Sequence, residues 1–445
     1  MKILKKFLKY IVLFVGIVAV LLLVFVLVAK IPTKYTEKNL KEAVSYFKEN
    51  PHEISRKKIE YKHTWIYPHA DQIALNIIYC LDTDKPLASL MEAKYYTRFE
   101  YDGSNTKYVN LIEDNLEPNT QYLRYWQGQV LILKPLLMIM TLEQIYMASA
   151  ILLIILLLVL FAILIKNKYF SIVISMIIGL IMTASWVVPQ SFCYAMMYFI
   201  MLITSIIAVI IEQKNLGNNK LYILFFITGI FTCFFDVLTT EILTILVPVL
   251  IVLAMRIKNR KMDSFKEQFL FLFKSGILWF IAYTCMWFAK WVLASIVLNI
   301  NAFDYVKKEA MVRINGTIGI WTTEEVMLKA LKNNFVILIP FYKSIKNNLH
   351  LLFAIIIPII AVLLISDFKD KQKRTFFILS AIIALVPYAR YLVLSNHSFL
   401  HSFFTFRCQL PTIMCVILVL VNCMDIKKMF SEVKISINRY KFKIK

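Results

Sequence analysis

The chain has 445 residues, of which 60% are hydrophobic, and its mean hydropathy is +0.68. A composition this apolar excludes an ordinary soluble domain and predicts an all-α polytopic membrane protein. The net charge of +22 arises from 50 Lys and Arg against 28 Asp and Glu. Because the basic residues gather in short segments between apolar stretches, they indicate cytoplasmic loops at a lipid bilayer and no nucleic-acid partner.

Apolar stretches of about twenty residues recur along the chain, and each is long enough for a helix to cross a bilayer. The first lies within residues 1–30. Because no small-x-small cleavage site follows it, we expect an uncleaved helix and not a signal peptide. Further spans bring the expected number to about ten. They run roughly over residues 142–165, 169–188, 191–211, 221–236, 240–255, 269–298, 351–366, 375–394 and 408–424.

The segments between these spans predict an orientation. If the N-terminus is cytoplasmic, every inner segment is short and basic, as the positive-inside rule requires, and the C-terminus is cytoplasmic too. Abundant Lys, Ile and Asn suggest AT-rich codon usage, so we expect a bacterial plasma membrane. The predicted organisation is a first transmembrane helix (1–30), a long extracytoplasmic loop (31–141), helices 2–7 (142–298), a second extracytoplasmic loop (299–350), helices 8–10 (351–424) and a basic tail (425–445).

The first loop contains two expected helices. Residues 36–60 predict an amphipathic, charged helix, and residues 71–81 place apolar side chains at helical spacing. Asp71 stands at the start of the second helix, next to His69 in an aromatic-rich stretch. It is either an N-terminal cap or a general base, because a partly desolvated carboxylate has a raised pKa and accepts a proton more readily.

Two further motifs in this loop have a structural and a functional interpretation. Asp82 and Asp84 form a D-x-D, a spacing that binds a divalent metal in some glycosyltransferases, but the following Lys-Pro favours a turn, and we expect no cofactor. Arg124 and Trp126 lie in the segment YLRYWQGQ. They are either membrane-interface anchors or groups that hold a phosphate and stack on a sugar ring.

Other polar residues are predicted at the same outer face. They are Asp236, Arg313, His397, His401 and Arg407. A transporter needs charges along a path near the bilayer midplane, whereas charges gathered at one face suit chemistry on a substrate presented at the outer leaflet. The exception is Lys290 within a span, where a lysine costs about 2.5–3.5 kcal/mol on insertion scales. It binds a lipid phosphate, or it snorkels or pairs with an acidic residue.

The layout resembles the GT-C class of integral-membrane glycosyltransferases, which take sugars from polyprenyl-phosphate donors. In that class an essential Asp in a long first outer loop acts as general base, and Asp71 in HADQIALNI is its counterpart here. The chain is also similar to a group of membrane proteins from Gram-positive anaerobes. That similarity lies in HADQIALNI, RYWQGQVLILKPLL and NHSFLHSFFTFR.

The resemblance implies transfer of a sugar to a surface glycan or cell-wall polymer. Asp71 would deprotonate the acceptor, while Lys290, Arg407 and Arg313 stabilise the phosphate leaving group. His397 or His401 would hold the phosphate or the sugar. Two alternatives remain at this stage: a polysaccharide polymerase or ligase of the O-antigen type, and a lipid or glycolipid transporter.

Overall fold

The computed structural model describes residues 2–49, 68–97, 107–315, 320–338 and 369–423, and the regular structure in these ranges is helical. Seven helices in the described ranges are long and apolar enough to cross a membrane, which confirms the predicted all-α membrane protein. They are Leu8–Ala29 within α1 (Lys2–Ala29), α7 (Leu142–Lys166), α9 (Phe192–Gln213), α10 (Asn218–Phe235), α12 (Phe265–Leu298), α16 (Lys371–Val393), and Ser402–Cys423, which includes α19 (Leu410–Cys423).

Two further bundle helices are shorter than a full span. α8 (Phe170–Met182) has 13 residues and continues into the 3-10 helix η3 (Ser185–Gln190), and α11 (Leu243–Lys258) has 16. The side chains of α11 are buried from Leu243 to Ile257, so this helix occupies the middle of the bundle. The predicted span 351–366 lies outside the described residues, and the expected number of ten spans stays a prediction.

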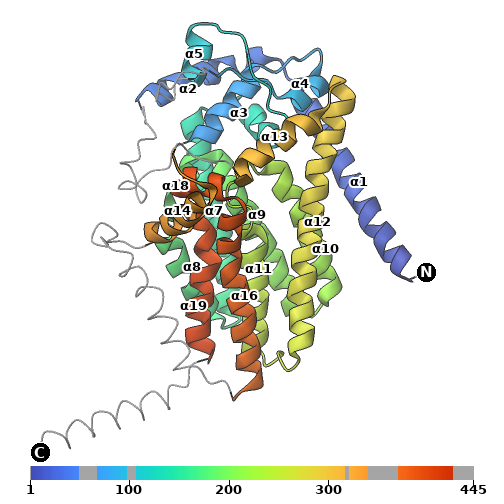
Figure 1. Cartoon of the computed structure of the whole chain (residues 1–445), viewed down its shortest axis with the longest axis vertical. Helices are drawn as coiled ribbons and strands as arrows, with labels where there is room; N and C mark the ends of the chain where they lie inside the picture. Colours follow the sequence, from blue (N-terminus) through green and yellow to red (C-terminus); the bar gives the residue numbers. More distant parts are fainter. Residues whose placement is uncertain (1, 50–67, 98–106, 316–319, 339–368, 424–445) are drawn as a thin grey trace, which may run out of the picture.

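Close helix contacts in the bundle depend on small residues. A Cβ added to Gly229 of α10 would lie 2.3 Å from the carbonyl oxygen of Trp279 in α12, and one on Gly179 of α8 would lie 2.6 Å from Leu410. Without a hydrophobic driving force between helices in lipid, such close backbone approach is a main source of association. By contrast, α1 leans away from the other helices (Figure 1), and only 6% of its most apolar window is buried.

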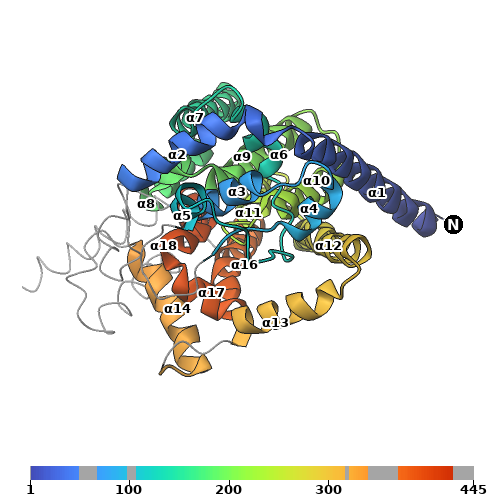
Figure 2. The ribbon, with the colours of Figure 1, turned by 90° about the horizontal axis from the view of Figure 1, so that it is seen from above.

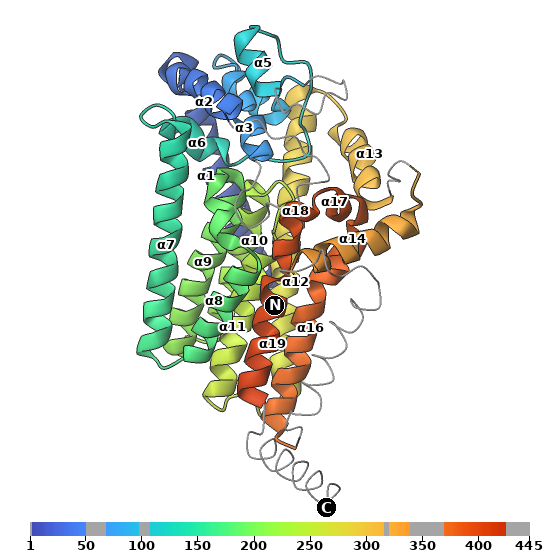
Figure 3. The same ribbon diagram turned by 90° about the vertical axis from the view of Figure 1, so that its left-hand side faces the viewer.

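Short helices gather at one end of the bundle (Figures 1 and 3). We call this region the cap; it comprises α2 (Glu37–Glu49), α3 (His69–Tyr79), α4 (Pro86–Glu92), α5 (Lys107–Glu113), α6 (Val130–Leu136) and α13 (Ala302–Asn315). α2 buries Leu40, Ala43, Val44 and Phe47 on one face, which confirms an amphipathic helix over Glu37–Glu49; residues 50–60 lie outside the described ranges. Lys134 of α6 donates a hydrogen bond to the carbonyl of Ala29 (3.0 Å) and so joins the cap to the end of α1.

The last bundle helix is approached through a compact turn at the same end. α17 (Ser395–Leu400) and α18 (Ser402–Thr405) lie beside α14 (Thr323–Ile337) (Figure 2). The buried Asn334 of α14 donates to the carbonyl of Ser398 (2.9 Å) and accepts from the hydroxyl of Thr405 (2.7 Å). These bonds fix the turn that carries His397 and His401.

Candidate anion-binding pocket

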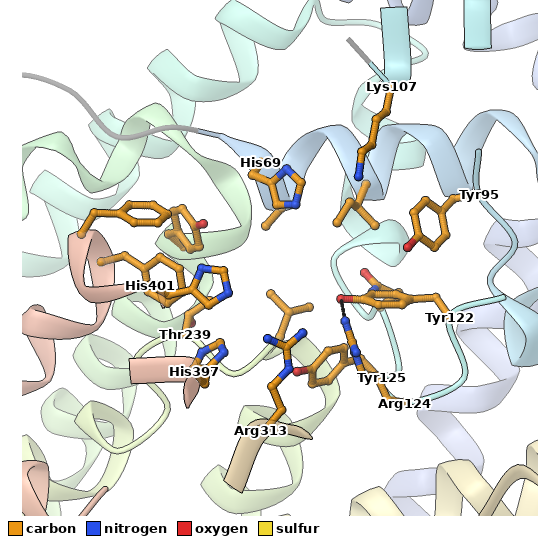
Figure 4. Close-up of a pocket in the computed structure, with 17 residues that line it drawn as sticks. His69, Tyr95, Lys107, Tyr122, Arg124, Tyr125, Thr239, Arg313, His397 and His401 are labelled. Carbon is orange, nitrogen blue, oxygen red and sulfur yellow. Dashed lines mark hydrogen bonds between the residues drawn. The ribbon is translucent and has the colours of Figure 1, made fainter. Parts of the chain in front are cut away.

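A cavity of about 200 Å³ lies between the cap and the adjoining end of the bundle. Figure 4 shows side chains from α3, α5, α13, α17 and the connecting segments converging on it. Its lining consists of His69, Ala70, Ile73, Tyr95, Lys107, Tyr122, Arg124, Tyr125, Gln127, Tyr194, Val237, Thr239, Arg313, His397, His401, Phe403 and Phe404. The described part of this lining contains basic and aromatic residues and no Asp or Glu.

Two of the lining cations have no anion to balance them. Within the described residues, neither Lys107 nor Arg313 makes a hydrogen bond or an ion pair, and the Nε atom of Arg313 is buried. Arg124 differs, because it forms an ion pair with Glu309 of α13 and donates to the hydroxyl of Tyr122 (3.2 Å). Counting Lys107, Arg124 and Arg313 against Glu309, the fixed groups around the cavity carry an excess of positive charge.

Three histidines face the same cavity. The Nε2 atom of His397 lies 2.7 Å from the carbonyl oxygen of Leu238. Since a carbonyl only accepts, Nε2 carries the proton, and Nδ1 of the neutral ring is a buried acceptor without a hydrogen-bond partner in the described structure. The rings of His397 and His401 have centroids 4.6 Å apart.

The surroundings keep these histidines neutral near pH 7. Burial, followed by the positive charge of Lys107, lowers the pKa of His69 to about 4. Burial and then Arg313 lower the pKa of His401 to about 3. The pKa of His397 is well below its ordinary value because of burial, His401 and Arg390. Desolvation and like charges both oppose protonation of an imidazole.

Aromatic rings cover much of the remaining wall. Tyr122 contacts Tyr95 and Tyr125 with centroid distances of 5.4 and 5.5 Å. On the other side, His401 stacks on Phe404 at 5.3 Å. Such flat, largely apolar faces next to cations suit a ligand that combines a ring with an anionic group.

Asp71 lies in the first turn of α3, but its carboxylate is fully buried and is not part of the pocket lining. It accepts hydrogen bonds from the backbone N–H groups of Phe192 (2.9 Å) and Cys193 (2.8 Å) and from the hydroxyl of Tyr146 (2.8 Å). Asp71 therefore caps the N-terminus of α9, a different helix from the one that sequence reasoning expected it to cap. Burial raises its pKa, whereas these hydrogen bonds lower it.

Lys290 and Trp126 hold the cap onto α12. The buried ammonium group of Lys290 donates to the carbonyls of Leu90 and Met91, both at 2.9 Å, in the last turn of α4. The indole N–H of Trp126 donates to the carbonyl of Met286 (2.8 Å). Neither side chain lines the cavity, and within the described residues Lys290 makes no ion pair with an acidic residue, which was one alternative from the sequence.

Arg407 and Asp236 are likewise buried outside the described lining. Arg407 donates to the carbonyls of Phe403 (3.0 Å) and Ala184 (3.4 Å). Asp236 accepts from the backbone N–H and the hydroxyl of Thr239, both at 2.9 Å, and its pKa is raised to about 7 by burial and then by Glu241. The structure thus brings together five of the predicted site residues: His69, Arg124, Arg313, His397 and His401.

Sequence reasoning missed Lys107, Tyr194 and Thr239 as lining residues. Lys107 and Thr239 lie in short or polar segments and Tyr194 lies in the apolar helix α9. None of them belongs to a recognisable motif, so only the folded arrangement identifies them. The D-x-D is a turn, since Asp82 accepts from the backbone N–H of Asp84 (2.8 Å). The described residues contain no group of three or more His, Cys, Asp or Glu side chains placed to hold a metal ion.

No protein-family model matches the chain, and comparison with curated proteins and with solved structures gives no match either.

Proposed function

We propose that the protein is a membrane glycosyltransferase that binds the phosphate of a polyprenyl-linked sugar donor in this pocket. The sugar would go to a surface glycan or cell-wall polymer. The proposal is supported by a cavity that combines fixed positive charge with aromatic faces at one end of a membrane bundle.

One observation carries the proposal. Lys107 and Arg313 border the cavity, and within the described residues neither has an anionic partner. Partly buried cations without partners are costly, because desolvation is not offset by an ion pair. A bound phosphate would supply the missing negative charge and accept charge-assisted hydrogen bonds from both groups.

The predicted orientation places the pocket at the outer face. The basic segments 212–220 and 256–268 adjoin the far ends of α9, α10 and α12 from the cap, and basic loops favour the cytoplasmic side (Figure 1). A donor anchored in the outer leaflet would then present its phosphate beside the cap, with its hydrocarbon chain remaining in lipid.

In the proposed reaction, an acceptor hydroxyl oxygen bonds to the anomeric carbon of the sugar while the bond from that carbon to the phosphate oxygen breaks. The electron pair leaves with the phosphate, where Lys107, Arg124 and Arg313 stabilise it. The hydroxyl proton goes to a base. Asp71 is the base suggested by sequence, but its hydrogen bonds occupy its oxygens, and neutral His69 on the same helix faces the cavity and is the better-placed acceptor.

A polymerase or ligase of the O-antigen type is the second candidate. It is favoured by a specific feature, the gathering of Arg124, Arg313 and three histidines around a described lining without carboxylates. Such an enzyme would also break a sugar–phosphate bond at the outer face, but it would transfer an entire glycan chain. The two candidates therefore differ in what is transferred.

Analysis of surface glycans from a deletion strain by mass spectrometry separates these functions. Loss of a single sugar supports the glycosyltransferase, and short or unlinked chains support the polymerase or ligase. Unchanged glycans with altered lipid uptake would contradict both and support a transporter.

A matched pair of variants tests the pocket itself. Complementation with Arg313→Leu should fail to restore the glycan, while Lys308→Leu, which removes an equal charge from an exposed position of α13, should restore it. Equal restoration by both variants would remove the pocket from the proposal.

A further inference from the structure

We propose that His397 takes up a proton when the pocket binds a phosphate group, so that anion binding and protonation are coupled. This inference rests on the proposed function, because it concerns the same site. It adds a regulatory property that does not follow from the positive charge alone.

The hydrogen bonds of His397 define its tautomer. Its Nε2–H donates to the carbonyl of Leu238, which leaves Nδ1 of the neutral ring as a lone-pair acceptor with no partner among the described residues. The side chain is 4% exposed and belongs to the cavity wall. A lone pair facing a phosphate oxygen is repulsive, whereas a protonated Nδ1 donates a charge-assisted hydrogen bond. The ring therefore suits an anion only after it gains a proton.

The groups packed around His397 explain why the ring is neutral beforehand. His401 lies beside it, Arg313 approaches from α13, and Arg390 approaches from α16 with its partner Glu241 from the segment before α11. The cap contributes the further basic groups His69 and Lys107, and the segment between α5 and α6 contributes Arg124. Except for Glu241, whose charge is paired with Arg390, these groups are basic. Burial and these positive charges hold the pKa of His397 well below its ordinary value.

A bound phosphate reverses this balance. It adds negative charge inside a poorly solvated cavity, and an opposite charge within a few ångströms favours the protonated imidazole. By linkage, the histidine that gains a proton on binding also strengthens binding as the pH falls, by up to about tenfold per pH unit for one coupled proton. The neighbouring His401 is the competing acceptor, but no hydrogen bond of its side chain within the described residues fixes its tautomer as Leu238 fixes that of His397.

Isothermal titration calorimetry of the purified full-length protein in detergent measures the coupling. Geranyl diphosphate is titrated near neutral pH in two buffers with different ionisation enthalpies, so that the difference in heat gives the number of protons taken up. We expect the natural sequence to take up close to one proton per ligand more than a variant in which residue 397 cannot titrate. The His397→Gln variant keeps an amide N–H for Leu238 but cannot titrate, and His401→Gln is the matched control. Because all three proteins bind the same ligand, its own ionisation cancels in the comparison.

The outcomes are distinct. Uptake that disappears in His397→Gln and persists in His401→Gln supports the proposal. Binding with equal proton uptake by the natural sequence and by His397→Gln overturns it and leaves the proposed function intact. Absence of any binding to the natural sequence would overturn both. Because the ionisation of the ligand itself contributes to the uptake by the natural sequence, the comparison with a folded His397 variant decides the question, and His397→Asn replaces His397→Gln if that variant does not fold.

Discussion

Two arginines at opposite ends of the helix bundle, Arg256 and Arg313, differ in whether their donors have acceptors among the described residues. At the end far from the cap, Arg256 of α11 donates to both carboxylate oxygens of Glu212 (3.1 and 2.9 Å) and to the side-chain oxygens of Gln268 and Asn218 (3.0 and 2.7 Å). At the pocket end, Arg313 makes no hydrogen bond within the described residues. A guanidinium whose donors are satisfied stabilises the fold, whereas one left without acceptors is available to a ligand. The comparison therefore separates structural from binding cations by their partners and not by their burial.

The largest effect is expected from breaking the satisfied network. Arg256→Leu leaves the carboxylate of Glu212 buried without its partner, because the side chains of the pair are only 8% and 11% exposed. Loss of one member of a buried pair costs about 3–5 kcal/mol. The free energy of unfolding, measured by denaturant titration in mixed micelles, should fall by that amount.

Glu212→Gln combined with Arg256→Leu is the matched control for this prediction. It removes the uncompensated charge, so part of the lost stability should return. If Arg256→Leu alone is as stable as the natural protein, the hydrogen bonds of Arg256 contribute nothing to stability. The proposed difference between Arg256 and Arg313 would then fail.

Arg313→Leu should have the reverse profile. Because no partner is left behind among the described residues, the free energy of unfolding should change by less than about 0.5 kcal/mol. Loss of a hydrogen bond to a charged group costs about 1.5–3 kcal/mol, so affinity for geranyl diphosphate should fall about ten- to a hundredfold. Calorimetry and thermal denaturation measure the two quantities, and a large loss of stability with unchanged affinity would assign Arg313 a structural role.

Asp71→Asn tests a carboxylate whose hydrogen bonds are as complete as those of Arg256. An amide offers one oxygen to the two backbone N–H groups of α9, so the free energy of unfolding should fall by about 1–3 kcal/mol. The protein that remains folded should retain sugar transfer, measured per folded molecule. If transfer is abolished while stability is unchanged, Asp71 is the general base and not a cap.

Much of the fold could be predicted from the sequence because hydropathy reports burial in lipid directly. The stretches 142–165 and 191–211 became α7 and α9, and alternation of basic and apolar segments set the proposed orientation. The predicted span 240–255 corresponds to α11. Its side chains are buried on all sides, which explains why the stretch is apolar throughout and not on one face only. The site was harder to predict from the sequence, because the partner of each polar side chain depends on distances between segments far apart in the chain.

Lys290 illustrates that limit. A lysine within an apolar span signals an unusual environment, and the sequence correctly singled it out as buried. It could not reveal that α4 would present two backbone carbonyls to the ammonium group. His397 is the complementary case, because the sequence placed it at a polar end of the bundle but could not show the single carbonyl that fixes its tautomer.

The smallest expected effect is the dependence of the free energy of unfolding on pH. It tests whether the pocket histidines are neutral, and Lys107, Arg124 and Arg313 stay unchanged. The folded-state pKa values of His69, His397 and His401 lie below that of an unfolded histidine, so the unfolded chain binds more protons as the pH falls from about 6.5 toward 4. Their contribution is complete above that window and is lost as the pH falls. Asp236 and Asp71, with raised pKa values, act in the opposite direction, and their contribution decreases as the pH rises, for Asp236 through about 7.

The effect of three histidines on the free energy of unfolding exceeds the opposite effect of two carboxyl groups. The melting temperature of the ligand-free protein should therefore rise with pH across this window. His401→Gln removes one titrating ring and should flatten the rise. Saturating geranyl diphosphate should flatten it further, since a bound anion restores the proton affinity of the ring that faces it. A melting temperature that falls with rising pH would mean that the carboxyl groups dominate. That outcome would contradict the prediction that the pocket histidines are neutral in the empty protein across this window.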